Sequence, residues 1–133
     1  MAKSQRVGLT AFVLLLVFSA SDYTMAASGP PIRIGVAGPM AFVQGQHHWY
    51  GAQMAAEQIN AAGGIRVGNQ MRPVELVRID TNEILSIEDA ATAVERAITV
   101  DRVDFLVGGF RTEAVFPMTE VAADYRKIFI IAG

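Results

Sequence analysis

Two glycine-containing segments hold the residues best suited to bind a small polar solute. The stronger one is residues 108–113, Gly-Gly-Phe-Arg-Thr-Glu, which follow an apolar run and precede a predicted helix. Thr112 offers a hydroxyl at the start of that helix, where backbone N–H groups without partners attract carboxylates. Arg111 could bind an acidic group through two parallel hydrogen bonds. The alternatives are that Thr112 only caps the helix and that Arg111 is a solvated charge.

The other segment, residues 38–46, joins an apolar run to an alanine-rich stretch. From its position alone, Gln44 in this segment would be a solvated loop residue. Neither Gly-x-Gly-x-x-Gly nor Gly-Lys-Ser/Thr occurs in the chain, which argues against a nucleotide-binding fold. We therefore expect no cofactor.

Catalytic and metal-binding patterns are weak. The two histidines, His47 and His48, are adjacent, so on a helix they point in different directions and cannot share one metal ion. Asp80, Glu83 and Glu88 could form an acid–base pair, but we interpret them as solvated loop and helix-dipole charges. No Gly-x-Ser-x-Gly sequence is present. The sequence therefore predicts a protein that is not an enzyme and holds no metal.

Apolar runs alternate with stretches of helical periodicity, which predicts an α/β fold with a doubly wound parallel sheet. Ser86 is a good N-cap for the second helix. Pro117 is expected to bend or delay the third. The expected elements are strands at 32–37, 74–79, 105–107 and 128–131, helices at about 47–62, 87–98 and 113–125, and a turn at Gly68-Asn69.

The N-terminus has the pattern of a secretory signal peptide, which we place at residues 1–26. Lys3 and Arg6 precede an apolar stretch at residues 9–20, which is shorter than the ~20 apolar residues of a membrane span. Cleavage after Ser21 or Ala26 would fit, and an uncleaved membrane anchor is the alternative. The chain has no cysteine, which excludes disulfides and a lipid-modified start. Its formal net charge of −2, without a basic stripe, argues against nucleic acid as a partner.

Residues 31–67 resemble the start of the mature periplasmic ligand-binding proteins of the leucine/isoleucine/valine-binding family. The matching features are the apolar strand, Gly38-Pro39, Gln44-Gly45, Gly51-Ala52 and the Ile-Asn-Ala-Ala-Gly-Gly-Ile stretch from Ile59 to Ile65. The resemblance extends over residues 31–133. It implies a type I periplasmic binding protein with flavodoxin-like strand order. Residues 27–133 would be the N-terminal part of its first lobe, incomplete at the C-terminus.

The same resemblance implies roles for individual residues. Thr112 occupies the position of a Ser or Thr that binds the ligand's carboxylate, and Phe110 and Arg111 form the adjoining wall of the pocket. Gln44 stands where family members often place an aromatic side chain against the ligand's variable group, which argues against a purely aliphatic ligand.

The implied function is the solute-binding component of an ABC importer. It would be a periplasmic monomer that binds a branched-chain or other amino acid, or a related small polar solute, and delivers it to a membrane permease. The alternatives are the ligand-sensing domain of a receptor and, third, an α/β enzyme.

Overall fold

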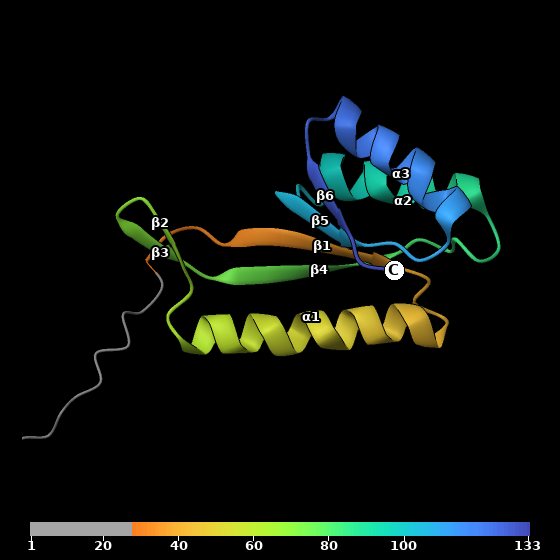
Figure 1. Cartoon of the computed structure of the whole chain (residues 1–133). Coiled ribbons are helices and arrows are strands. Elements are labelled where there is room, and N and C mark those ends of the chain that lie inside the picture. The colour runs from red at the N-terminus through yellow and green to blue at the C-terminus, as the bar shows by residue number, and fades with distance from the viewer. Residues whose placement is uncertain (1–27) are drawn as a thin grey trace, which may run out of the picture.

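The computed structural model describes residues 28–133 (Figure 1). The predicted signal peptide, residues 1–26, lies outside the described residues. In chain order the elements are β1 (Ile32–Gly38), α1 (Val43–Ala61), β2 (Ile65–Val67), β3 (Gln70–Arg72), β4 (Val74–Asp80), α2 (Ile87–Thr99), β5 (Phe105–Gly108), α3 (Thr112–Asp124) and β6 (Ile128–Ile131).

Four strands form one sheet in the order β4-β1-β5-β6, and each neighbouring pair is parallel. Counted along the chain, these strands have the order 2-1-3-4, as in a flavodoxin-like sheet. The α/β fold class and the strand order predicted from the sequence are therefore confirmed. The direction of winding reverses between β1 and β5. Ligands of open α/β sheets bind beyond the carboxyl ends of the strands at such a reversal.

The sheet has helices on both faces (Figure 1): α2 and α3 cover one, and α1 lies on the other. The main core fills the space between the sheet, α2 and α3, where Val94, Leu106 and Met118 are fully buried. The predicted apolar stripe of α2 is confirmed, because Ala90, Val94, Ala97 and Ile98 are its buried residues. No helix within residues 28–133 is long and apolar enough to cross a membrane.

Helix α1 begins at Val43, four residues before the predicted start at His47. The helix includes Gly45, which the sequence suggested was part of a loop. A Cβ at Gly45 would overlap the carbonyl group of Pro39, so glycine allows the first turn of α1 to pack directly on the end of β1. This contact is tertiary, which explains why local sequence patterns placed the start of the helix too late.

The predicted turn at Gly68-Asn69 is confirmed, since it joins β2 and β3 in a small antiparallel hairpin. Gly68 has a φ of 62°, a left-handed conformation that glycine adopts readily. The short strands β2 and β3 were not predicted, and Pro73 separates β3 from β4.

Candidate functional site

The carboxyl ends of the parallel strands lie at one edge of the sheet, together with the loops that follow them (Figure 1). Several hydrogen bonds join these loops to one another and to the strand ends. The amide of Met40 donates to Oδ1 of Asp80 at 3.1 Å, which links the loop after β1 to the end of β4. The amide of Gly109 donates to the carbonyl of Ala37 at 3.0 Å, which links the loop after β5 to β1. These bonds therefore fix the loops after β1 and β5 relative to the strands of the sheet.

Gly108 brings the end of β5 unusually close to β1. Its φ is 121°, and a Cβ at this position would overlap the carbonyl oxygen of Ala37. Only glycine fits both the backbone conformation and the space. The positive φ of Gly108 therefore lets the chain turn at the end of β5.

The structure places Gln44 at this edge, as the second residue of α1, with its side chain half-buried. The helix has Phe42 at its N-cap, and no side chain caps it. Its first-turn amides are therefore among the groups that a polar solute at this edge could contact.

Thr112 is the first residue of α3 and is exposed at the same edge. The alternative that Thr112 caps the helix is wrong. The N-cap is Arg111, whose carbonyl accepts the amides of Ala114 and Val115 at 2.9 and 3.0 Å, and no side chain caps α3. Pro117 lies inside α3 and does not delay its start. The Thr112 hydroxyl is thus not engaged as a helix cap.

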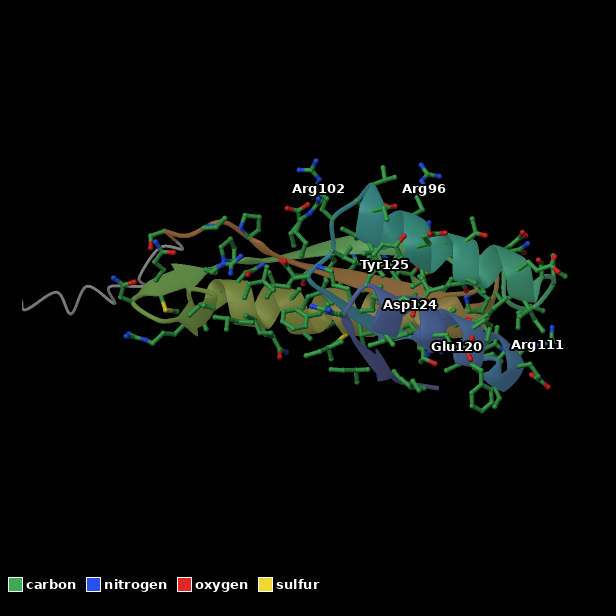
Figure 2. All side chains as sticks on the ribbon, turned by 90° about the horizontal axis from the view of Figure 1, so that it is seen from above. Arg96, Arg102, Arg111, Glu120, Asp124 and Tyr125 are labelled. Carbon is green, nitrogen blue, oxygen red and sulfur yellow. The ribbon has the colours of Figure 1, made fainter. Side chains whose placement is uncertain are left out.

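Arg111 lies at the start of α3 (Figure 2). Its guanidinium is held by protein groups: Nη1 donates to the carbonyls of Glu83 and Ile84 at 3.4 and 3.3 Å, and Nε donates to Oε2 of Glu113 at 3.3 Å. In this position Arg111 fixes its own loop. The bidentate contact with a ligand acid that the sequence suggested would require the side chain to leave these partners.

The first turn of α3 already stabilises one carboxylate. The pKa of Glu113 lies below its usual value of 4.5, because its own backbone N–H and then the Arg111 guanidinium favour the ionised form. Glu113 is exposed and can move aside. Phe110, which precedes Arg111 in the loop after β5, is also exposed and adds an apolar surface near the first turn of α3.

Glu83 is the residue that the sequence interpretation missed. The expectation of a solvated loop charge is wrong for Glu83, which is fully buried, whereas Glu88 is exposed in the first turn of α2 as expected. The Glu83 carboxyl group accepts the amides of Phe110 and Arg111 at 3.2 and 3.1 Å. No local pattern signals this burial, because the partners are backbone groups 27 and 28 residues away.

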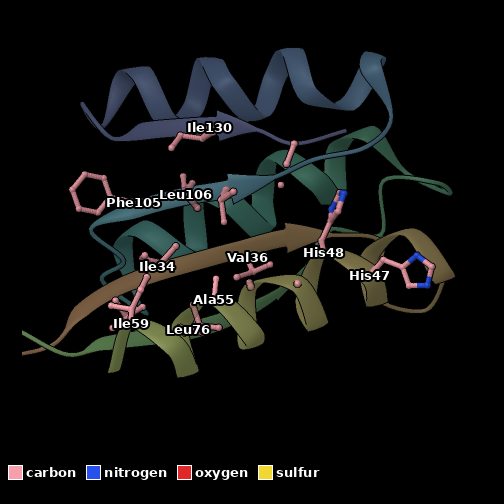
Figure 3. Close-up of a pocket in the computed structure, with 17 residues that line it drawn as sticks. Ile34, Val36, His47, His48, Ala55, Ile59, Leu76, Phe105, Leu106 and Ile130 are labelled. Atoms are coloured by element: carbon pink, nitrogen blue, oxygen red, sulfur yellow. The ribbon is translucent and has the colours of Figure 1, made fainter. Parts of the chain in front are cut away.

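The four predicted ligand contacts line neither of two hollows in the surface. One hollow, of about 450 Å³, lies between α1 and the sheet and has an almost wholly apolar lining that includes Ile34, Ala55 and Phe105 (Figure 3). His47 and His48 stand at one end of it. The other, of about 560 Å³, lies beside β4 and α2. An apolar lining offers few partners to a polar solute, which argues against the hollow between α1 and the sheet as the site of such a solute.

Comparisons with known proteins agree with this fold. The sequence profile of the periplasmic binding protein family matches residues 31–133. An amino acid binding protein of Pseudomonas aeruginosa is 32% identical over 131 residues, which are 96% of this chain and 32% of that protein.

Two solved structures have the same arrangement of elements. The branched-chain amino acid transporter substrate binding protein LivJ from Streptococcus pneumoniae, in complex with isoleucine, superposes with a TM-score of 0.67 and 26% identity over 76% of this chain and 28% of LivJ. The leucine binding protein LivK from Thermotoga maritima gives a TM-score of 0.61 and 25% identity over 75% of this chain and 27% of LivK. The chain thus spans about a third of the length of the curated relative and less of the solved ones.

Proposed function

Because the chain belongs to the periplasmic binding protein family, we propose that it binds an amino acid, or a related small solute with a carboxylate, at the carboxyl edge of its sheet. The protein would act outside the cytoplasm as a monomer and deliver the solute to the membrane permease of an ABC importer. Support comes from the relatives, which include an amino acid binding protein and two branched-chain or leucine binding proteins.

The observation that carries the proposal is the open first turn of α3. The N-cap residue contributes no side-chain hydrogen bond, and within residues 28–133 the amide of Thr112 donates to no protein acceptor. Amides at a helix N-terminus bind carboxylates well, because they donate hydrogen bonds and carry the positive end of the helix dipole. The lowered pKa of Glu113 supports a carboxylate at this place. A ligand carboxylate would displace that side chain and bind the Thr112 hydroxyl as well.

The other predicted contacts would bind the rest of the solute. Gln44 lies in the first turn of α1, which follows β1 on the opposite side of the winding reversal from α3. Its amide side chain would contact the variable group of the solute, and the exposed ring of Phe110 would form an apolar wall. Arg111 supports the loop, because its guanidinium is bonded to protein carbonyls.

Binding by a two-lobed protein would end in closure. The first lobe would hold the carboxylate, and rotation about a hinge would bring the second lobe over the solute. The permease would then recognise the closed form. Closure requires contacts from both lobes, so residues 1–133 alone should bind the solute weakly or not at all.

A screen of the complete protein encoded by the gene tests the proposal. Each of the twenty amino acids is added at millimolar concentration and the melting temperature is recorded, followed by calorimetric titration of those that raise it. A ligand at 100 times its Kd stabilises the folded state by about 2.7 kcal/mol. We expect at least one amino acid to raise the melting temperature and its decarboxylated amine to have no effect. No response to any amino acid, or an equal response to the amine, would contradict the proposal.

A further inference from the structure

Glu83 is completely buried in the loop between β4 and α2. Burial of a carboxyl group is costly unless hydrogen bonds replace its contacts with water. Here they do. The hydroxyl of Thr81, also fully buried, donates to Oε1 at 3.1 Å, and the amides of Phe110 and Arg111 both donate to Oε2.

The loop after β5 also donates hydrogen bonds to the loop that holds Glu83. The Arg111 guanidinium donates to the carbonyls of Glu83 and Ile84, so each loop binds the backbone of the other. The two side chains do not meet as an ion pair. Instead, the carboxyl group fixes the amides that lead into α3, and the guanidinium fixes the carbonyls around Glu83. We call this reciprocal set of bonds the Glu83 clasp.

The clasp ends immediately before Thr112, the proposed contact for the ligand carboxylate. The Glu83 carboxyl group accepts hydrogen bonds from the amides of residues 110 and 111, and the next amide along the chain belongs to Thr112. Glu83 holds Arg111 at its amide, and the first turn of α3 holds it at its carbonyl, which accepts the amides of Ala114 and Val115 and lies in the same peptide plane as the Thr112 amide. The position of the Thr112 hydroxyl and amide therefore depends on a side chain that is itself buried away from solvent.

We propose that Glu83 is a positioning residue for the solute site: it holds residues 110–112 so that Thr112 faces the ligand carboxylate, without touching the ligand. The assignment rests on the proposed function. It explains why a carboxyl group is buried where an apolar side chain would fill the same space, because only an acceptor can orient two amides.

Glu83→Ala and Glu83→Gln separate positioning from bulk stability. Glu83→Ala removes the acceptor and should weaken the binding of L-leucine, or of whichever amino acid binds the complete protein most tightly, by at least about tenfold in calorimetric titration. Glu83→Gln keeps an amide oxygen for the two N–H groups and an NH2 group for Thr81, so its Kd should stay within about threefold of the wild-type value. In Glu83→Ala, hydrogen exchange at the amides of Phe110 and Arg111 should accelerate.

Val94→Ala is the matched control for stability. Val94 is fully buried in the core between α2 and the sheet, so its truncation lowers the melting temperature but leaves the loop after β5 unchanged. All titrations are made well below the melting temperature of the least stable variant. Val94→Ala should bind the amino acid as tightly as the wild type.

Thr81→Val provides a second test if Glu83→Ala does not fold. It keeps the shape of the side chain but removes the donor to Oε1, and should weaken binding about threefold or more, whereas Thr81→Ser should not. Unchanged affinity in a folded Glu83→Ala, or in Thr81→Val, would overturn the positioning role while the proposed function stands. A wild-type protein that binds no amino acid would overturn both.

Discussion

Helices α2 and α3 both begin at the carboxyl edge of the sheet, but their N-termini are satisfied in different ways. At α2 the residue Ser86 is the N-cap, and its hydroxyl accepts the amide of Asp89 at 3.1 Å. The Asp89 carboxylate in turn accepts the side-chain amide of Asn82 at 2.7 Å. This N-terminus is closed by residues of its own loop.

At α3 no local side chain caps the helix. The amides just before it are bound by Glu83, which comes from the loop in front of α2, and the amide of Thr112 is left to other partners. A local cap stabilises a helix and closes its end. A distant acceptor fixes the backbone and leaves the end open. On the proposed function, the capped N-terminus of α2 serves the stability of the fold and the uncapped N-terminus of α3 serves binding.

The largest expected effect comes from Gly108→Ala, which would disrupt the connection that places α3 at the edge. The new Cβ would overlap the Ala37 carbonyl in a backbone conformation that strains any other residue. We expect a loss of stability on the order of 4 kcal/mol, from strain and overpacking together, in urea unfolding.

Gly68→Ala is the control for Gly108→Ala. Gly68 also has a positive φ, but no atom lies near its missing Cβ, so the cost should be only about 1–2 kcal/mol. If the two variants are equally destabilised, the close approach of β5 to β1 is not what holds the loop before α3.

Thr112→Ala should affect affinity and spare stability. A lost hydrogen bond to a charged ligand group costs about 1.5–3 kcal/mol, which corresponds to about tenfold or more in Kd. Since Thr112 is exposed and is not the N-cap, the free energy of unfolding should change by less than about 0.5 kcal/mol. Thr112→Ser keeps the hydroxyl and should bind normally. If the affinity of Thr112→Ala is unchanged, the Thr112 hydroxyl at the start of α3 does not bind the ligand.

Ser86→Ala should show the opposite pattern at α2. Loss of the cap should lower stability by about 1 kcal/mol, measured by urea unfolding, with no change in the Kd for an amino acid. A matching loss of affinity would mean that the two helix N-termini do not have separate roles.

The smallest expected effect is the titration of Glu113 in the first turn of α3. Its pKa in the folded state is lower than in the unfolded chain, so the stability that it contributes is present above pH 4.5 and is lost as the pH falls through the lowered value. NMR titration of the side-chain carbonyl should show this lowered pKa, and Arg111→Gln should raise it toward 4.5. An unchanged pKa in Arg111→Gln would assign the shift to the backbone N–H alone.

Features with a local cause could be predicted from the sequence. Val94 and Ala97 follow the helical period, Ser86 precedes that stretch, and the strands of the sheet are short apolar runs; all are found as expected. The start of α1 could not be placed, because it depends on Gly45 packing on Pro39. The N-cap of α3 could not be placed either, because it depends on the backbone conformation after Gly108 and Gly109, which both have a positive φ.

The site could be predicted only in outline. Glycine-containing loops after two apolar runs indicated the edge where Gln44 and Thr112 lie. The clasp could not be predicted, because Glu83 binds backbone amides and a sequence carries no pattern for an acceptor whose donors are backbone groups in another loop. The roles of Gln44 and Thr112 in ligand binding stay predictions.

Amide chemical shifts of the complete protein, recorded with and without a bound amino acid, test the central claim most directly. We predict that the largest changes fall on the amides of Thr112 and Glu113, with a smaller change at Gln44, and that the first turn of α2 changes little. Changes concentrated on residues that line the apolar hollow, such as Ala55 and Phe105, would place the ligand between α1 and the sheet and contradict the account.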